Sequence, residues 1–425
     1  MAASLAVALR TLGCKVNRAE SEAIAAELLG AGVRIVAEDE AAVIVVNTCT
    51  VTGEADAKAR KAVRQALAAA HEPVVVVTGC LAALDREALT ALGRRVVVEA
   101  DKERVASVVR ELLGEAGASP HPAQPASAPP GAFRTRVALK IEDGCDAMCA
   151  YCIVPHARGV PRSTPLATVS AQAQALADAG TPEIVLTGVN VGRYADGGAD
   201  LADVVNAVAA TGISRVRLSS IEPLDLTARL LETLSAIPAF CVHLHIPLQA
   251  GSDAVLSAMG RTYTAEQFTE RVQAAREALP GLVVTTDVMA GFPGETAEQA
   301  AETLAFCQRT GFAKLHVFRY SKRPGTPAAQ RPDQVADTQK AARASALREV
   351  SARLTRQHAA SRIGVAAEVL VERTDRGGEV AAFAEGTTRD YLRVRFPGRE
   401  AYAGELAQVR LLAVDRDRVL GERLA

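Results

Sequence analysis

Residues 136–159 read RVALKIEDGCDAMCAYCIVPHARG, an apolar strand pattern followed at once by Cys145, Cys149 and Cys152. Further strand candidates, separated by helical patterns, lie at 183–189, 215–221, 242–248, 282–289 and 314–320. Repeated strand–helix units of this kind predict an α/β barrel of the TIM type, here a partial one of six units. Functional groups of such barrels lie at the carboxyl ends of the strands. The three cysteines therefore stand where chemistry is expected.

The first hundred residues form a separate strand–helix alternation, with strand candidates at 5–13, 41–48, 73–79 and 94–100. Continuous apolar strands of this kind indicate a parallel sheet covered by helices on both faces. Cys14, Cys49 and Cys80 follow the first three strands, so a parallel sheet would gather them at one edge. Three unrelated small residues at strand ends are the alternative. Asn17 and Glu20 have the spacing of a capping box for the first helix.

Composition divides the chain further. Residues 114–134 are rich in Pro, Ala, Ser and Gly, which predicts a linker between an N-terminal domain at 1–113 and the barrel domain at 135–358. Residues 360–425 show short alternating strands and Gly turns, which predict a small all-β barrel.

The bulk properties exclude some classes of protein. The net charge is −1, so a nucleic-acid partner would have to use local basic patches. No apolar run approaches the roughly 18–20 residues of a membrane span, and the first residues lack a secretory pattern, so we expect a cytoplasmic protein without a membrane partner. Cysteines grouped in a reducing compartment bind metal more often than they form disulfides.

The spacing of the cysteines limits the kind of metal centre. Neither trio supplies the four ligands of a closed zinc site. Three cysteines on one short loop fit a [4Fe–4S] cluster with one iron left open, which can bind a small molecule. The spacing C-x3-C-x2-C after the first strand of a barrel indicates a radical S-adenosylmethionine (SAM) site. Cys241 and Cys307 lie in apolar surroundings, and we expect them only to pack.

Several independent motifs resemble those of the radical SAM methylthiotransferases, and the resemblance covers nearly the whole chain except the linker. The motifs are the cluster loop at 144–159, TLGCKVNRAESEA (11–23), VVNTCTVTGEADAKARK (45–61), VVTGC (76–80), LHIPLQAGSD (244–253), VMAGFPGET (288–296) and HVFRYSKRPGTPAA (316–329). The C-terminal segment resembles a TRAM domain, an RNA-binding module.

The resemblance implies two [4Fe–4S] clusters. Cys145, Cys149 and Cys152 would hold the cluster that binds SAM and generates the 5′-deoxyadenosyl radical. Cys14, Cys49 and Cys80 would hold a second cluster that carries the sulfur. The expected SAM contacts, each at or near the end of a strand, are Tyr151, Gly188, Asn190, Glu222, Gln249 and Gly291. An electron donor such as flavodoxin or ferredoxin and a sulfur source are implied as partners.

The residues in these motifs are most similar to those of one branch of the family. That branch converts N6-threonylcarbamoyladenosine at position 37, in the anticodon loop of tRNA, to its 2-methylthio derivative. Alternatives are the same chemistry on isopentenyladenosine 37 or on a ribosomal-protein aspartate, and a non-catalytic metal-binding RNA scaffold. The candidate RNA patches are Lys58, Arg60, Lys61 and Arg64, the basic helix at 340–362, and Arg389, Arg393 and Arg395 around Tyr391.

Overall fold

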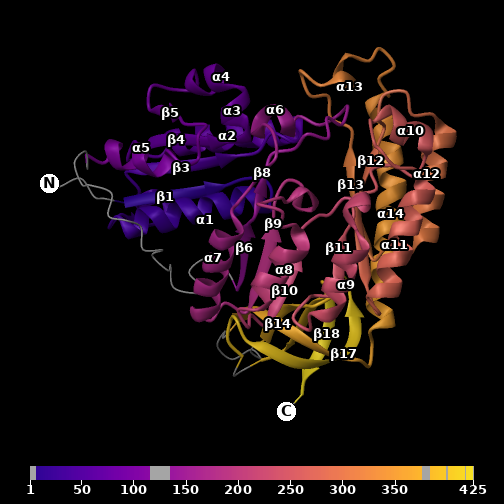
Figure 1. The fold of residues 1–425 in the computed structure, drawn as a ribbon. Helices are drawn as coiled ribbons and strands as arrows, with labels where there is room; N and C mark the ends of the chain where they lie inside the picture. Colours follow the sequence, from indigo (N-terminus) through magenta and orange to yellow (C-terminus); the bar gives the residue numbers. More distant parts are fainter. Residues whose placement is uncertain (1–5, 115–134, 376–382, 399–400, 417, 425) are drawn as a thin grey trace.

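A computed structural model describes residues 6–114, 135–375, 383–398, 401–416 and 418–424. Figure 1 shows an N-terminal α/β domain in indigo, a barrel of strands and helices in magenta to orange, and a small β-barrel in yellow beneath it. The linker predicted at 114–134 lies, except for Gly114, outside the described residues. Among the helices of the described part, none is both long and apolar enough for a membrane span.

The N-terminal domain is built on a five-stranded sheet in the order β2-β1-β3-β4-β5, with every pair parallel. Its strands are β1 (Ala6–Thr11), β2 (Arg34–Ile35), β3 (Val43–Thr48), β4 (Val74–Gly79) and β5 (Val96–Val98). Its helical segments are α1 (Lys15–Gly30), η1 (Glu38–Glu40), α2 (Gly53–Leu67), α3 (Cys80–Leu84), α4 (Arg86–Thr90) and α5 (Val105–Leu112). Two apolar clusters pack against this sheet: α2 contributes to one, and α1 and α5 contribute to the other. The predicted sheet covered on both faces is confirmed.

The start of α1 differs from the prediction. The helix begins at Lys15, after Cys14, and Cys14 makes no side-chain cap. The predicted capping box of Asn17 and Glu20 is therefore wrong, because Asn17 already lies in the first turn. Both side chains are buried and are used in contacts with other segments.

The middle of the chain is a partial barrel, as predicted. Its strands are β6 (Arg136–Lys140), β9 (Glu183–Thr187), β10 (Arg215–Leu218), β11 (His243–His245), β12 (Val283–Ala290) and β13 (Lys314–Arg319). They form two parallel sheets, β10-β9-β6 and β11-β12-β13, joined by bridges between Val216 and Phe240 and between Ser220 and His245. Within the described residues β6 does not pair with β13, so the barrel is open between these two edge strands.

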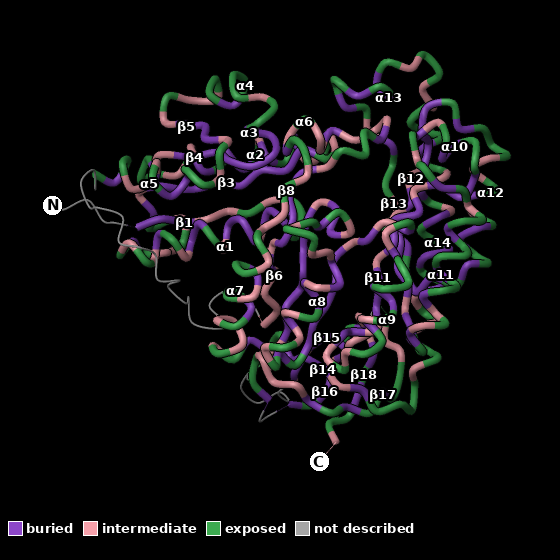
Figure 2. Tube along the Cα trace, viewed as in Figure 1, coloured by how far each residue is buried: buried purple, intermediate pink, exposed green. Residues whose placement is uncertain are grey.

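Helices cover the outside of the barrel with their solvent-facing sides exposed, and the central strands are buried, whereas the edge strand β13 is largely exposed (Figure 2). The long helices are α7 (Leu166–Asp178), α8 (Leu201–Ala209), α9 (Ala228–Ala236), α11 (Ala265–Ala278), α12 (Ala297–Thr310) and α14 (Asp337–Ser361). Short elements in the loops are β7 (Glu142–Asp143), α6 (Val154–Arg158), β8 (Arg162–Ser163), η2 (Val191–Arg193), η3 (Pro223–Asp225), α10 (Asp253–Ala258) and α13 (Pro327–Gln330).

The C-terminal segment forms a closed five-stranded barrel in the order β14-β15-β16-β18-β17, which confirms the predicted small all-β barrel. Its strands are β14 (Ala366–Asp375), β15 (Phe383–Thr388), β16 (Arg393–Pro397), β17 (Leu406–Asp415) and β18 (Arg418–Arg423). Two fully buried arginines of β10 attach it to the larger barrel. Arg215 donates to Thr387 O and Glu368 O, and Arg217 donates to Arg389 O, 2.8 Å away.

Candidate active site

Cys14, Cys49 and Cys80 meet at the carboxyl edge of the N-terminal sheet. Cys14 follows β1, Cys49 directly follows β3 and Cys80 directly follows β4. Burial raises the pKa of the Cys49 thiol, and the nearby thiols of Cys80 and Cys14 raise it further. Cys14 is exposed, whereas Cys49 and Cys80 are buried. The structure therefore brings this trio together, as the sheet topology predicted.

A buried pair of amides fixes the first two cysteine loops. The Asn17 side chain donates to Asn47 Oδ1 and to Thr48 O, each 2.9 Å away, and Asn47 donates back to Asn17 O at 2.9 Å. Cys14 Sγ lies 3.1 Å from Asn17 Oδ1. These bonds tie the loop after β1 to the end of β3, so the positions of Cys14 and Cys49 depend on each other.

Two glycines allow the cysteine loops to approach closely. Gly13 has φ +101°, and a Cβ there would lie 2.6 Å from Cys49 Cβ. Gly79 has φ +90°, and its Cβ would lie 2.4 Å from Thr48 O. Each glycine precedes a cysteine, and neither position accepts a side chain without moving a neighbouring loop.

Cys145, Cys149 and Cys152 lie on the loop that follows β7, near the ends of the first barrel strands. Cys145 N donates to Gly159 O at 3.0 Å, and Ala150 N, between Cys149 and Cys152, donates to Met259 O at 2.9 Å; these bonds fix the loop at two points. Burial, together with the neighbouring thiols of Cys149 and Cys145, raises the pKa of Cys152 to about 12. The loop thus gathers the second trio.

The chemistry of the donor sets fits iron–sulfur clusters. No three His, Cys, Asp or Glu groups in the described part of the chain are arranged to hold a single metal ion. A four-iron cluster spaces its thiolate ligands more widely than one ion does, and each trio supplies three thiols. One arginine also faces a sulfur in each trio: Arg158 Nε lies 3.2 Å from Cys80 Sγ, and Arg261 Nη1 lies 3.4 Å from Cys149 Sγ. Guanidinium donors of this kind stabilise ligating thiolates.

Arg158 is the centre of a buried ionic cluster between the two domains. Its Nη1 lies 2.7 Å from both Glu20 Oε1 of α1 and Asp143 Oδ1 of β7. Lys102 and Lys140 pair with the same carboxylates. Burial alone would raise the pKa of Glu20 and Asp143, but Arg158 and the two lysines lower both. Arg158 therefore connects the loop of the second trio to the domain that carries the first.

Unsatisfied polar atoms mark a binding site at the ends of the barrel strands. Among the buried side-chain atoms that find no hydrogen-bond partner within the described residues, four lie close to the ends of the first barrel strands: Glu142 Oε1, Thr187 Oγ1, Asn190 Oδ1 and Ser219 Oγ. They lie in β7, at the end of β9, in the following loop and just after β10. Buried polar atoms are almost always bonded, so these four fit a polar ligand such as SAM. The predicted contacts Gly188 and Asn190 lie here, and a Cβ on Gly188 would meet Glu142 Oε2 at 2.7 Å.

The other residues predicted to bind SAM interact with neighbouring groups of the protein. Glu222 forms an ion pair with Arg261. Burial raises the pKa of Tyr151, and the nearby positive charge of Arg261 partly opposes this rise. Gln249 has φ +67°, a conformation in which an ordinary residue is strained, and its N–H donates to Asp287 O at 2.8 Å. Gly291 N donates to Glu295 Oε2 at 2.8 Å, and a Cβ there would lie 2.3 Å from Lys340 Cγ.

The pH dependence of stability tests whether the pKa of Glu142, at the end of the first barrel strands, is raised. Burial raises its pKa from the usual 4.5 to about 7, so folding favours the protonated form. Stability from this group is therefore present below pH 4.5 and is lost as the pH rises through 7. We expect the thermal unfolding midpoint of the wild type to fall relative to that of Glu142→Gln between pH 5 and pH 8. Parallel curves for the two proteins would contradict the raised pKa.

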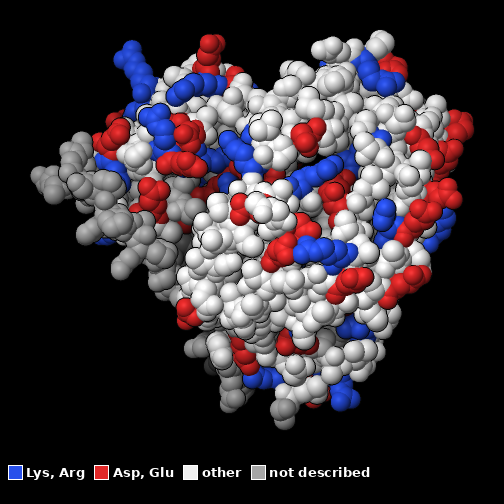
Figure 3. Space-filling view, viewed as in Figure 1, with Lys and Arg blue, Asp and Glu red and all other residues white. Residues whose placement is uncertain are grey.

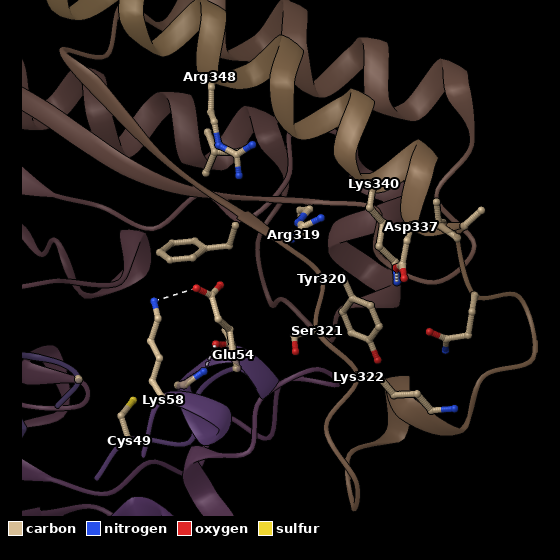
Figure 4. Close-up of a pocket in the computed structure, with 18 of the residues that line it drawn as sticks. Cys49, Glu54, Lys58, Arg319, Tyr320, Ser321, Lys322, Asp337, Lys340 and Arg348 are labelled. Atoms are coloured by element: carbon tan, nitrogen blue, oxygen red, sulfur yellow. Dashed lines mark hydrogen bonds and ion pairs between the residues drawn. The ribbon is translucent and has the colours of Figure 1, made fainter. Parts of the chain in front are cut away.

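A cavity of about 1030 Å³ separates the N-terminal domain from the last barrel strand and α14; we call it the inter-domain cavity (Figure 4). The N-terminal side contributes Leu12, Gly13, Cys49, Thr52, Glu54, Ala55 and Lys58. The opposite side contributes residues 317–322, 334–337, Lys340 and Arg348. Arg323 anchors the two sides, because its Nη2 lies 2.6 Å from Thr50 Oγ1 and 2.8 Å from Asp56 Oδ2. Cys49 of the first trio therefore opens onto a large solvent-connected space.

Several residues of the basic patches that were expected to bind RNA are engaged in contacts within the protein. Charges of both signs are mixed over the face in Figure 3, without one continuous basic surface. Arg60 pairs with Asp85, and Lys58 lines the inter-domain cavity. Arg389 and Tyr391 do not form the expected patch, because they contact the larger barrel: Arg389 donates to Phe240 O, and the Tyr391 ring lies 4.0 Å from the Arg217 guanidinium.

Comparisons with known proteins match both cysteine-bearing parts of the chain. The radical SAM superfamily matches residues 139–307, and a family described as "Uncharacterized protein family UPF0004" matches residues 6–99. The threonylcarbamoyladenosine tRNA methylthiotransferase MtaB of Bacillus subtilis is 39% identical, over 96% of this chain and 93% of the relative. The protein of the same name from Thermotoga maritima is 34% identical, over 98% and 96%.

Relatives that carry another name are also similar to this chain. The tRNA-2-methylthio-N(6)-dimethylallyladenosine synthase of Sorangium cellulosum is 33% identical, over 97% of this chain and 92% of the relative. Among solved structures, the radical SAM methyltransferase TsrM from Kitasatospora setae matches with a TM-score of 0.55 at 16% identity, over 77% of each chain. That match describes the fold alone.

Proposed function

The chain belongs to the radical SAM methylthiotransferases, enzymes that use SAM and [4Fe–4S] clusters, and on that premise we propose that it converts N6-threonylcarbamoyladenosine at position 37 of tRNA to its 2-methylthio derivative. The observation that carries this proposal is the near full-length match to relatives named for that substrate, at 34–39% identity. Relatives of similar coverage that are named for dimethylallyladenosine are 30–33% identical.

We assign a different cluster to each of the two cysteine trios. Cys145, Cys149 and Cys152 hold the cluster that binds SAM, and Cys14, Cys49 and Cys80 hold the cluster from which sulfur is transferred. When bound, these groups supply radical chemistry at an unactivated C–H bond, which side-chain acids and bases cannot perform. The thiol donors, the arginine beside each trio and the unsatisfied polar atoms near Asn190 support this assignment.

The chain's own residues position the reactants. Asn17 and Asn47 hold the loops of Cys14 and Cys49 in place, and Glu142 and Asn190 present oxygen atoms to SAM. The inter-domain cavity gives the RNA access to Cys49, and its volume suits a nucleoside. Anticodon-loop bases can be turned outward at low cost, so the target adenosine can enter such a cavity. The enzyme also needs an electron donor such as flavodoxin or ferredoxin and a source of sulfur.

Mass spectrometry of tRNA nucleosides tests the substrate. We expect 2-methylthio-threonylcarbamoyladenosine to appear when this protein is expressed in cells that lack their own version of the enzyme. A Cys145→Ala variant, expressed to the same level, serves as the inactive control. The isopentenyl product alone would contradict the choice of substrate. No change in any tRNA nucleoside, with iron-loaded protein present, would instead favour a ribosomal-protein aspartate.

A further inference from the structure

The aromatic ring of Phe318 is exposed to solvent in the inter-domain cavity. It lies in β13 and lines the inter-domain cavity, with 45% of its surface exposed. Every other phenylalanine in the described ranges is buried or half-buried, and six of them are at most 2% exposed. A single exposed apolar side chain is common on protein surfaces, so what distinguishes Phe318 is its place in the cavity lining, where its aromatic face is free to contact a ligand.

The position of the ring relates it to the first trio. β13 is an edge strand on the open side of the barrel, and the N-terminal domain forms the opposite wall of the cavity. Gly13 and Cys49 belong to that opposite wall. A flat group that rests on Phe318 would therefore enter the same space onto which Cys49 opens.

The charge of the cavity lining favours an anionic ligand. Five cations line it: Lys58, Arg319, Lys322, Lys340 and Arg348. Glu54 neutralises Lys58 at 2.7 Å, and Asp337 neutralises Lys340 at 3.2 Å. Within the described part of the chain, no hydrogen bond or ion pair engages the side chains of Lys322 and Arg348. Arg319 lies close enough to Glu54 for its charge to help Lys58 lower the pKa of that carboxyl. Figure 4 shows Arg319, Lys322 and Arg348 on the barrel side of the cavity, across from Cys49.

An aromatic face beside uncompensated cations is the combination that binds single-stranded nucleic acid, because bases stack on the ring while cations bind phosphates. We propose that Phe318 stacks against a base of the RNA substrate in the inter-domain cavity, and that Arg319 and Arg348 bind its neighbouring phosphates. This inference rests on the proposed function, since it takes tRNA as the substrate. Beyond the proposed function, the inference names the residues that bind the RNA on the side of the cavity opposite Cys49.

Binding of a labelled anticodon stem-loop that carries threonylcarbamoyladenosine tests the stacking. Stacking on an aromatic side chain contributes about 1–3 kcal/mol per base, which corresponds to about 5- to 150-fold in affinity. We expect Phe318→Leu, which keeps apolar bulk but removes the aromatic face, to weaken binding within that range. Phe318→Tyr keeps the ring and should bind within about twofold of the wild type.

Salt dependence tests the phosphate contacts separately. Each phosphate contact to a single strand contributes about −0.7 to the slope of log affinity against log salt. We expect Arg348→Gln and Arg319→Gln each to make the slope shallower by about that amount, whereas Phe318→Leu should leave it unchanged. Unaltered slopes in both arginine variants would overturn the phosphate assignment.

The outcomes separate this inference from the proposed function. If the wild type binds and modifies the stem-loop but Phe318→Leu binds it equally well, the stacking inference is wrong and the proposed function stands. If the wild type neither binds nor modifies it, the proposed function fails first. Competition for the cavity by an acidic peptide, with no RNA binding, would overturn both in favour of a protein substrate. Equal iron content and equal thermal midpoints of the variants confirm that folding is intact.

Discussion

Replacing Cys14 with alanine is expected to abolish methylthio transfer while SAM cleavage continues. Cys14 belongs to the trio on the N-terminal sheet, whereas Cys145, Cys149 and Cys152 form a separate loop on the barrel. Loss of one thiolate should remove or impair only the cluster of its own trio. Cys14 is exposed, so the substitution leaves no cavity in the core. The effect is therefore chemical, with little change in the free energy of unfolding.

Two products measured in the same reaction check this expectation. Formation of 5′-deoxyadenosine reports SAM cleavage, and the methylthio nucleoside reports transfer. Cys14→Ala should retain the first, lose the second and contain about half the iron of the wild type. Cys145→Ala should lose both activities. Cys307→Ala is the control, because Cys307 is buried in the barrel core and should retain both. Full transfer by Cys14→Ala would show that this trio does not carry the sulfur.

The gathering of the cysteines could be predicted because it depends on topology. Parallel strands place their carboxyl ends at one edge, so Cys49 and Cys80 come together although they are far apart in sequence. The six barrel strands followed from short apolar runs separated by helical patterns. Local spacing was less reliable for details: Asn17 and Glu20 have the spacing of a capping box, but both side chains bind groups on other segments. A buried tertiary contact outweighed the local signal.

The arginines at the cysteine trios could not have been found from spacing. Arg261 meets Cys149 across 112 positions of sequence, and Arg158 meets Cys80 across 78. Only the packing of loops from different strands brings these groups together. The same holds for Tyr391, which was expected to face RNA but lies against Arg217 and 4.5 Å from the ring of His243. Its basic neighbours in sequence gave no sign that the larger barrel would cover it.

Arg158→Met is expected to produce the largest loss of stability. The Arg158 side chain is 3% exposed, and its guanidinium lies between Glu20 and Asp143, which are also buried. Removing one partner of a buried ionic group leaves the other charges uncompensated and costs about 3–5 kcal/mol. Lys102 and Lys140 remain near the carboxylates, so we expect the lower end of this range. Thermal unfolding of the iron-loaded protein measures the change.

Arg229→Met is the matched control, because Arg229 also bridges two carboxylates, Asp200 and Asp203, but on the exposed surface. Solvent screens such pairs, and we expect no measurable shift in the unfolding midpoint. The triple variant Glu20→Gln, Asp143→Asn, Arg158→Met removes the buried charges together and should recover much of the lost stability. If Arg158→Met and Arg229→Met behaved alike, the buried cluster would not hold the two domains together.

The pH dependence of Arg158→Met identifies the groups responsible. Because Arg158 contributes to the lowered pKa of Glu20 and Asp143, their contribution to stability is present above their usual pKa values of 4.5 and 3.8 and is lost as the pH falls further. The difference in unfolding midpoint between the wild type and Arg158→Met should therefore shrink on acidification below about pH 4.5. Arg158 also donates to Cys80 Sγ, so if Cys14, Cys49 and Cys80 hold a cluster as proposed, removing this hydrogen bond should lower the reduction potential of that cluster. The potential of the other cluster should not change, and a shift in both would indicate a general structural effect in place of the contact with Cys80.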